Sequence, residues 1–478
     1  MTRSFYWHDY ETWGANPQRD RACQFAGLRT DESLIPIGDP LVIYCRPASD
    51  LLPQPDACLI TGITPALAER KGLAEAVFAA RIYDELARPG TCGVGFNSMR
   101  FDDEVSRNLF YRNFLDPYAR EWQNGNSRWD LIDALRLAHA LRPAGIQWAK
   151  REDGVTSFQL EHLTAANGIE HGRAHDALAD VNATIALARL LKQAQPRLYE
   201  YALTLRTKHK VETLIGKGAP LLHVSARYPA QQGCIAPVLP VARHPTNKNG
   251  VIVFDLRQDP RILADLSVEE IRQRLFTATA NLPDGVDRIP LKGIGTNRSP
   301  MLAPMGTLNT AAAERWAIDP RVVEQHAVAL RAIPGLAKKI QLVHSGRVFE
   351  PQTDPDLMIY SGGFFSDRDR RAMQTVRETS AADLDAVAVR FDDARLPEML
   401  FRYRARNWPE TLSTVAEQEE WNAFRLRRLT EADGGGSIQL DAYQERIMRL
   451  REEIGDDGEK ARVLDDLEVW AQHVMDAT

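Results

Sequence analysis

The sequence has few of the features that mark secreted, disulfide-bonded or membrane proteins. Its cysteines are odd in number and have no C-x-x-C spacing, which argues against a disulfide framework or a zinc site: Cys23, Cys45, Cys58, Cys92 and Cys234. No stretch approaches the ~20 consecutive apolar residues of a membrane helix, and residues 1–10 lack the basic-then-apolar order of a secretory signal. We therefore expect a cytoplasmic protein that makes no membrane contact and buries its cysteines.

An overall positive charge is also missing, since the net charge of the 478 residues is −6. The charge is unevenly distributed, however. Residues 196–349 carry 21 Lys and Arg against 12 Asp and Glu, a net charge of +9, whereas residues 1–195 and 350–478 carry −4 and −11. The basic middle third is suited to a polyanion. A chain of this length exceeds one core, and we predict three domains with these same boundaries.

The first third has the pattern of a mixed sheet with helices packed on it. Alternating apolar residues and turn signals predict strands at 4–10, 23–30, 41–46 and 91–96. Helical spacing of apolar residues predicts helices at 73–86, 101–114, 129–141, 157–167 and 176–194.

The remaining two thirds of the chain differ from each other in the secondary structure that their sequences predict. Strands are predicted at 221–228, 234–242, 250–256 and 288–293, with a helix capped by Ser267 and Glu270 and another at 320–332. This pattern indicates a small barrel-like domain with helical insertions. From residue 350 the chain is charged and helical, with helices predicted at 367–378, 417–430, 440–454 and 460–475.

The most informative residues are carboxylates that are far apart in the sequence. Asp9 and Glu11 are two residues apart in a predicted strand, so both side chains point to one face. Asp102 opens a helix after a glycine-rich strand end, and His175 precedes Asp180 by five residues. Each feature alone is weak evidence for a functional site, but four carboxylates and a histidine in this order form a specific pattern.

These residue types are suited to phosphodiester hydrolysis. Carboxylate oxygens are the hard ligands that Mg²⁺ and Mn²⁺ prefer, and four of them can hold two ions ~3.5–4 Å apart for in-line cleavage. His175 is the candidate general base toward the attacking water. Five residues on one helix lie about 140° apart, so we expect His175 in the loop or first turn before Asp180.

Structural explanations exist for the same residues. Asp102, followed by Asp103 and Glu104, is also what a helix N-terminus favours on electrostatic grounds alone. A single histidine such as His175 is more often structural or solvated than catalytic. Asp180 is harder to explain in this way, because an isolated carboxylate on an apolar helix face is costly. Taken together, the residues favour a catalytic site.

Three motifs resemble those of the DEDDh 3′→5′ exonucleases, which have a ribonuclease-H-like fold: His8-Asp9-Tyr10-Glu11-Thr12, Asn97-Ser98-Met99-Arg100-Phe101-Asp102-Asp103 and His175-Asp176-Ala177-Leu178-Ala179-Asp180. The resemblance to the bacterial exodeoxyribonuclease I family extends along nearly the whole chain. It includes Leu59-Ile60-Thr61-Gly62-Ile63-Thr64-Pro65, Arg128-Trp129-Asp130-Leu131 and Tyr403-Arg404-Ala405-Arg406-Asn407.

The resemblance implies an exonuclease domain (1–195), an SH3-like β-barrel domain (196–349) and a helical C-terminal domain (350–478). It implies processive 3′→5′ degradation of single-stranded DNA to 5′-mononucleotides in DNA repair and recombination. It also implies two Mg²⁺ ions, which Mn²⁺ can replace, and docking of the C-terminal tail of single-stranded DNA-binding protein. We expect a monomer.

The resemblance also assigns roles to residues. Asp9, Glu11 and Asp180 are metal ligands, Asp102 is the fourth acidic residue, with a metal-binding and catalytic role, and His175 is the base. The implied substrate contacts are Glu11, Thr12, Arg107, Tyr118, Trp122, Arg136 and Gln159. Gln159 departs from the arginine expected at its position, so phosphate affinity and its salt dependence are expected to be weaker there.

Arginine and aromatic residues alternate in residues 107–142, as expected for a protein that combines phosphate contacts with base stacking. The alternative for Phe110, Tyr111 and Trp129 is a place in the core. Other candidate phosphate contacts are Arg206-Thr207-Lys208-His209-Lys210 and Arg298. Arg402, Arg404 and Arg406 alternate along the chain, which is compatible with one face for phosphate or an acidic protein tail, or with a solvated surface.

The leading hypothesis is a metal-dependent single-stranded DNA exonuclease. One alternative is an RNA-trimming or proofreading exonuclease with the same chemistry. Another is a DNA-binding scaffold without catalysis, which would have no need for mutually repelling carboxylates near a phosphate.

Overall fold

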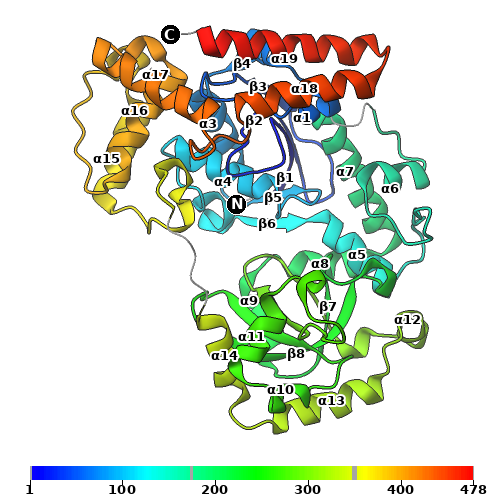
Figure 1. Cartoon of the computed structure of the whole chain (residues 1–478). Helices are drawn as coiled ribbons and strands as arrows, with labels where there is room; N and C mark the ends of the chain where they lie inside the picture. Colours follow the sequence, from blue (N-terminus) through cyan, green and yellow to red (C-terminus); the bar gives the residue numbers. More distant parts are fainter. Residues whose placement is uncertain (1–2, 173–175, 347–351, 477–478) are drawn as a thin grey trace. The chain divides into compact units, whose positions relative to one another are not determined.

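A computed structural model describes residues 3–172, 176–346 and 352–476 (Figure 1). The chain forms two compact units. We call the first the terminal unit, because it combines Met1–Ser127 and His171–Asn182 with Pro351–Thr478. The second, the middle unit, comprises Arg128–Glu170 and Ala183–Glu350. Among the described residues, no helix combines the length and apolar character that crossing a bilayer requires.

A six-stranded mixed sheet, in the order β4-β3-β2-β1-β5-β6, underlies the candidate site. Its strands are β1 (Ser4–Thr12), β2 (Ala22–Thr30), β3 (Leu41–Cys45), β4 (Gly72–Leu73), β5 (Thr91–Gly95) and β6 (Ser127–Asp130). β2 pairs antiparallel with β1 and with β3, whereas β5 runs parallel to β1. The predicted mixed sheet is therefore confirmed. The helix predicted from residue 129 was wrong at its start, because Trp129 lies in β6 and Asp130 caps the helix that follows.

β1 extends beyond its parallel partner. The pairing with β5 runs from Ser4 opposite Thr91 to Trp7 opposite Val94, and β1 then continues to Thr12 along β2 alone. The chain turns sharply after β5, where a Cβ on Gly95 would lie 2.6 Å from the Cβ of Ser98. The end of β1 is thereby left open on one side for side-chain contacts.

The helices of the terminal unit come from both ends of the chain. They are α1 (Pro55–Thr61), α2 (Pro65–Lys71), α3 (Glu75–Leu86), α4 (Asp102–Arg112), α15 (Asp367–Glu378), α16 (Arg395–Asn407), α17 (Val415–Thr430), α18 (Leu440–Ile454) and α19 (Gly458–Asp476), together with the start of α7 (Ala177–Ala194). α3, α4 and the C-terminal helices α15 and α17–α19 confirm the predictions within a few residues. α1 and α2 were not predicted.

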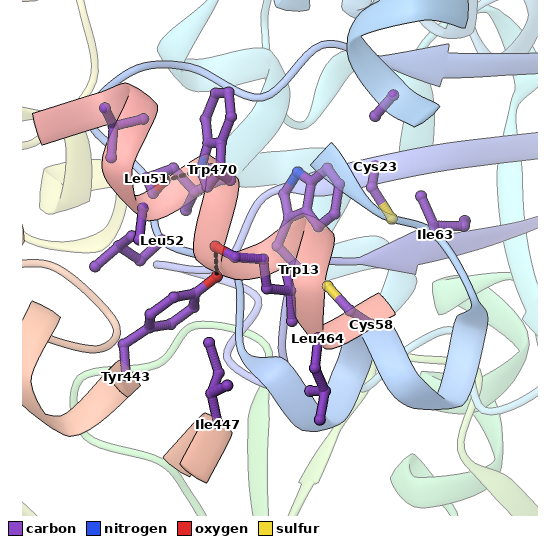
Figure 2. Close-up of a cluster of buried hydrophobic side chains, with 14 of the residues drawn as sticks. Trp13, Cys23, Leu51, Leu52, Cys58, Ile63, Tyr443, Ile447, Leu464 and Trp470 are labelled. Carbon is purple, nitrogen blue, oxygen red and sulfur yellow. Dashed lines mark hydrogen bonds between the residues drawn. The ribbon is translucent and has the colours of Figure 1, made fainter. Parts of the chain in front are cut away.

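The core cluster in Figure 2 joins the two ends of the chain. Trp13, Leu51 and Cys58 from the first 60 residues pack against Tyr443 and Trp470 from the last 40. The indole N–H of Trp470 donates to the carbonyl of Leu51 at 2.9 Å. α18 and α19, orange and red in Figure 1, lie against α1 in this cluster. The six-stranded sheet and the C-terminal helices therefore share a core.

A buried ion network reinforces the same junction. Asp50 accepts hydrogen bonds from Arg21 at 3.1 Å and from Arg406 at 2.8 Å, and Arg428 lies 3.5 Å away. Arg406 also pairs with Asp356 at 2.8 Å. Burial alone would raise the pKa of Asp50, but the surrounding guanidinium groups outweigh it and hold the pKa well below its ordinary value.

Arg402, Arg404 and Arg406 do not form one exposed face. They lie on α16, where residues four apart share a side and the residue between them does not. The side chains of Arg402 and Arg406 are buried and pair with carboxylates, and Arg404 pairs with Glu417. These three arginines support the interior of the terminal unit.

The middle unit is built on a five-stranded antiparallel sheet in the order β10-β9-β8-β7-β11. The strands are β7 (Leu221–Val224), β8 (Ile235–Arg243), β9 (Gly250–Asp255), β10 (Leu291–Gly295) and β11 (Met301–Pro304). The unit also contains α5 (Leu131–Leu141), α6 (Leu160–Ala166), α8 (Pro196–Thr204), α9 (Lys208–Gly216), α11 (Val268–Phe276), α13 (Pro320–Ala332) and α14 (Leu336–Ser345). β11, α8 and α9 were not predicted.

Two local predictions are confirmed. Ser267 and Glu270 form a reciprocal capping box at the start of α11. All five cysteine side chains are buried.

The ion network generates a stability prediction. Replacing Asp50 with Asn leaves buried arginine charges without their carboxylate, so we expect the free energy of unfolding to fall by about 3–5 kcal/mol. Urea denaturation at pH 7 measures this change. Asp153→Asn is the control, because Asp153 forms an exposed pair with Arg151 and its replacement should leave the urea midpoint unchanged. Equal midpoints for Asp50→Asn and the wild type would contradict the stabilising role of the network.

Candidate active site

Three carboxylates from distant positions meet at the open end of β1. Asp9 and Glu11 lie on β1, and Asp180 lies on α7, near the helix start. One carboxylate oxygen from each of the three lies within 4.8 Å of the others. The two-residue spacing of Asp9 and Glu11 places both on one face of the strand, as the sequence predicts.

Asp102 is hydrogen-bonded to the same strand. It is the first residue of α4, and its Oδ1 accepts a hydrogen bond from the backbone N–H of Tyr10 at 3.2 Å. This N–H is available because β1 has passed the end of its pairing with β5. The Tyr10 hydroxyl lies 3.0 Å from the hydroxyl of Ser106, one turn further along α4. Tyr10 therefore fixes the helix that carries Asp102.

The two acidic residues that follow Asp102 have other partners. Asp103 pairs with Arg120 at 2.6 Å, and both side chains are buried. Glu104 pairs with Arg107 at 2.6 Å. The run of three acidic residues at the start of α4 thus divides into one residue at the candidate site and two that contact arginines.

Asp180 has a histidine partner that the sequence analysis did not identify. Asp176 caps α7 by accepting hydrogen bonds from the backbone N–H groups of Leu178 and Ala179, so Asp180 lies one turn into the helix. Nε2 of His171 lies 2.6 Å from Oδ1 of Asp180. Nine residues separate the pair in the sequence, a spacing that carries no recognised signal. His175, the predicted base, lies outside the described residues.

Crowding of like charges alters the protonation of these groups. Burial raises the pKa of Asp9 well above its ordinary value, and the charges of Asp102, Glu11 and Asp180 raise it further. Burial followed by the charges of Asp180 and Asp102 raises the pKa of Glu11 to about 8. Such a cluster requires protons or cations to balance its charge. Its donor set consists of oxygen atoms, so the residues fit Mg²⁺ or Mn²⁺.

A cavity of about 920 Å³ opens beside the carboxylates. Glu11, Thr12 and Phe101 line it at the candidate site, and Gln54 and Ile60 line it further away. The Thr12 hydroxyl donates to the carbonyl of Gly14 at 2.7 Å, which leaves its oxygen as an acceptor. The volume of the cavity lies in the range of small-molecule binding sites, which is about 300–1,000 Å³.

The predicted substrate contacts of the terminal unit differ in exposure. Trp122 is 66% exposed and Tyr118 is partly exposed. Arg107 is buried and forms a two-pronged ion pair with Glu121 at 2.7 and 2.9 Å. Phe110, Tyr111 and Trp129 are almost fully buried, so the core alternative holds for all three.

Arg136 and Gln159 belong to the middle unit. Arg136 is buried, pairs with Asp133 at 2.7 Å, and has its guanidinium 5.4 Å from the ring centre of Phe158. Gln159 is exposed at the N-cap of α6, where its side chain makes no capping hydrogen bond.

A mixed sheet with carboxylates at the end of its first strand and on two packed helices defines an exonuclease of the ribonuclease-H-like class. Family comparisons agree. An exonuclease family model matches residues 6–188, the exonuclease I SH3-like domain matches 206–346, and the exonuclease I C-terminal domain matches 353–474. The predicted fold class is confirmed in all three parts.

Similarity to individual proteins extends over the whole chain. Exodeoxyribonuclease I of Escherichia coli is 46% identical over 99% of this chain and 98% of its own length. The Haemophilus influenzae enzyme is 43% identical over 96% of both chains. The solved structure of a moderately thermophilic exonuclease I from Methylocaldum szegediense has a TM-score of 0.95 at 48% identity, covering 99% of this chain and 100% of its own. The chain belongs to the exodeoxyribonuclease I family.

The carboxylate cluster generates a prediction that separates activity from stability. Asp9→Asn removes one candidate ligand charge, so we expect nucleotide release to fall roughly 10²–10³-fold or more. Because the same change relieves repulsion, the melting temperature in EDTA should remain unchanged or rise. Asp180→Asn should lose activity in the same way.

An exposed carboxylate of α3 provides the matched control, since Asp84→Asn removes the same charge elsewhere in the terminal unit. Activity and calorimetry are measured on all three variants. Full activity of Asp9→Asn in Mg²⁺ would refute its assignment as a ligand.

Proposed function

We propose that the protein is a metal-dependent 3′→5′ exonuclease that degrades single-stranded DNA processively to 5′-mononucleotides. The convergence of Asp9, Glu11 and Asp180 at one strand end carries this proposal. Whole-length similarity to exodeoxyribonuclease I supports it. The solved E. coli relatives include complexes with dA16 and dT13 oligonucleotides and a zinc-bound complex with single-stranded DNA.

In this proposal each residue has a defined task. Asp9, Glu11, Asp102 and Asp180 would hold two Mg²⁺ or Mn²⁺ ions, which when bound would supply Lewis-acid activation of water and neutralise charge on the scissile phosphate. His175 accepts the proton of the attacking water at a ring nitrogen. The cavity beside Glu11 receives the terminal nucleotide, whose 3′ hydroxyl donates to Thr12.

The strand is held by the predicted contacts Arg107, Tyr118, Trp122, Arg136 and Gln159. The domains are 1–195, 196–349 and 350–478, boundaries that the matched family ranges support. The protein acts as a monomer in the cytoplasm during DNA repair and recombination. It docks the C-terminal tail of single-stranded DNA-binding protein, a partner that the resemblance of the sequence implies.

The alternatives make different demands on the site. A non-catalytic DNA-binding scaffold would gain nothing from buried carboxylates that repel one another and a phosphate. An RNA-trimming or proofreading exonuclease uses the same carboxylates, so only the substrate distinguishes it.

End-labelled substrates test the proposal directly. With Mg²⁺, single-stranded DNA labelled at its 5′ end should yield a ladder of shortening products, and DNA labelled at its 3′ end should release labelled mononucleotide at once. RNA of the same sequence should be degraded more slowly, and EDTA should stop the reaction. Early release of the 5′ label would overturn the polarity, and equal rates on RNA would favour the RNA-trimming alternative.

Gln159 provides a prediction about affinity. Gln159→Arg adds one cation at the position where the resemblance leads us to expect an arginine, so DNA binding should tighten and the plot of log K against log salt should steepen by about 0.7. Fluorescence anisotropy in EDTA over a salt series measures both. Gln374→Arg adds the same charge on an exposed position of α15 and should leave the slope unchanged. An identical slope for Gln159→Arg and the wild type would place residue 159 away from the DNA backbone.

A further inference from the structure

Asp180 differs from the other candidate ligands in how its position is fixed. Asp9 and Glu11 lie on β1, where the pairing with β2 fixes the backbone, and Asp102 is hydrogen-bonded to the same strand. Asp180 lies in the segment His171–Asn182, which belongs to the terminal unit although the residues before and after it in the chain belong to the middle unit. Asp180 is outside the sheet, so other contacts have to hold it beside β1.

The residues that precede α7 lie against the start of this helix. Nε2 of His171 lies 2.6 Å from Oδ1 of Asp180, and the two side chains are only 9% and 18% exposed. At the next residue, a Cβ on Gly172 would lie 3.5 Å from the Cβ of Ala179. Two consecutive residues therefore lie against two consecutive residues of the helix, and the histidine pair is part of a packed contact.

The ring of His171 is the hydrogen-bond donor in this pair. An ionised carboxylate has no proton to donate, so Nε2 carries the proton and Oδ1 of Asp180 accepts it. The bond holds one of the two carboxylate oxygens and so limits the rotation of the carboxylate plane. His171 thereby determines where the second oxygen of Asp180 points.

The type of donor matters because a cation site has to keep its negative charge. Asp50, Glu75 and Asp103 are buried carboxylates of the same unit, and each pairs with an arginine. A guanidinium is always charged, whereas an imidazole can donate an N–H without carrying a charge. The backbone N–H that binds Asp102 is likewise uncharged. A neutral donor orients a carboxylate and leaves its charge available to a cation.

An orienting contact is needed because the neighbours of Asp180 repel it. One carboxylate oxygen of Asp180 lies within 4.8 Å of oxygens from Asp9 and Glu11. Burial raises the pKa of Glu11 to about 8, and Asp180 is the largest of the charges that add to this effect. An aspartate side chain can relieve such repulsion by changing its rotamer. The hydrogen bond from His171 opposes that change.

We propose that His171 is a positioning residue that holds the Asp180 carboxylate in the orientation required to bind a divalent cation. This inference rests on the proposed function. Hydrogen bonds to the ligands of a metal ion orient those ligands, and removing one typically lowers metal affinity roughly 10- to 100-fold. The role differs from that proposed for His175, because His171 acts through Asp180 and not on the attacking water.

Binding of Mn²⁺ tests this role without requiring catalysis. The electron paramagnetic resonance signal of free Mn²⁺ is followed while the full-length protein is added. We expect His171→Leu to bind Mn²⁺ roughly 10- to 100-fold more weakly than the wild type. His171→Gln keeps an N–H donor and should restore most of the affinity. His473→Leu removes an exposed histidine of α19 and should bind like the wild type.

A double-mutant cycle shows whether His171 acts through Asp180. In the Asp180→Asn background, His171→Leu should cause little further loss of Mn²⁺ affinity. Losses that add fully would overturn the positioning role, because the histidine would then act independently of Asp180. Melting temperatures in EDTA show that each variant is folded. If His171→Leu does not fold, His171→Asn replaces it, since this polar side chain is too short to reach Oδ1.

Nuclease assays over a series of Mg²⁺ concentrations supply a second readout. The Mg²⁺ concentration for half-maximal nucleotide release should rise roughly 10- to 100-fold in His171→Leu, and saturating Mg²⁺ should restore the maximal rate. A lower maximal rate with unchanged Mn²⁺ affinity would mean that His171 acts on the reaction itself, and would overturn the proposal.

The outcomes are separable from the proposed function. If His171→Leu binds Mn²⁺ as tightly as the wild type and the wild type degrades single-stranded DNA, the positioning role is refuted and the exonuclease stands. If the wild type releases no nucleotide, the proposed function fails, and the Mn²⁺ affinities alone decide the role of His171.

Discussion

Mutual repulsion among Asp9, Glu11, Asp102 and Asp180 is the constraint around which the terminal unit is organised. Carboxylates brought this close in a buried setting oppose folding, and the raised pKa values of Asp9 and Glu11 express that opposition. The strand geometry of β1 and the hydrogen bond from Tyr10 to Asp102 hold the groups in place. These contacts oppose the mutual repulsion of the carboxylates, and the negative charge of the site favours divalent cations.

Elsewhere in the terminal unit, buried charges attract one another instead of repelling. Around Asp50, arginines from both ends of the chain converge on carboxylates, so burial is compensated by attraction. The C-terminal helices thus pack on the sheet through both a shared apolar core and an ion network. Near α4, Arg107 takes part in both kinds of contact. It neutralises Glu104 and Glu121, and it also contacts the aromatic residues Tyr118 and Tyr360.

The sequence predicted those features that follow from local periodicity. The alternation of a strand placed Asp9 and Glu11 on one face, and a capping box located the start of α11. Short helices were not predicted: α1, α2 and α8 each begin at a proline, Pro55, Pro65 and Pro196, which occupies the first helical position. Contacts between residues that are far apart in the sequence were also not predicted. No spacing rule links His171 to Asp180 or buries Arg402, since both depend on how separate elements pack.

The interleaving of the chain's two ends within one unit has a consequence for synthesis. Trp13, Leu51 and Cys58 leave the ribosome early, but their packing partners around Tyr443 and Trp470 are translated last. The carboxylates of β1 therefore exist on the nascent chain long before the sheet that carries them has its full core. A polypeptide released before α18 retains every acidic residue of the site and lacks the framework that holds them together. The complete core of this unit therefore forms only after α18 and α19 have been translated.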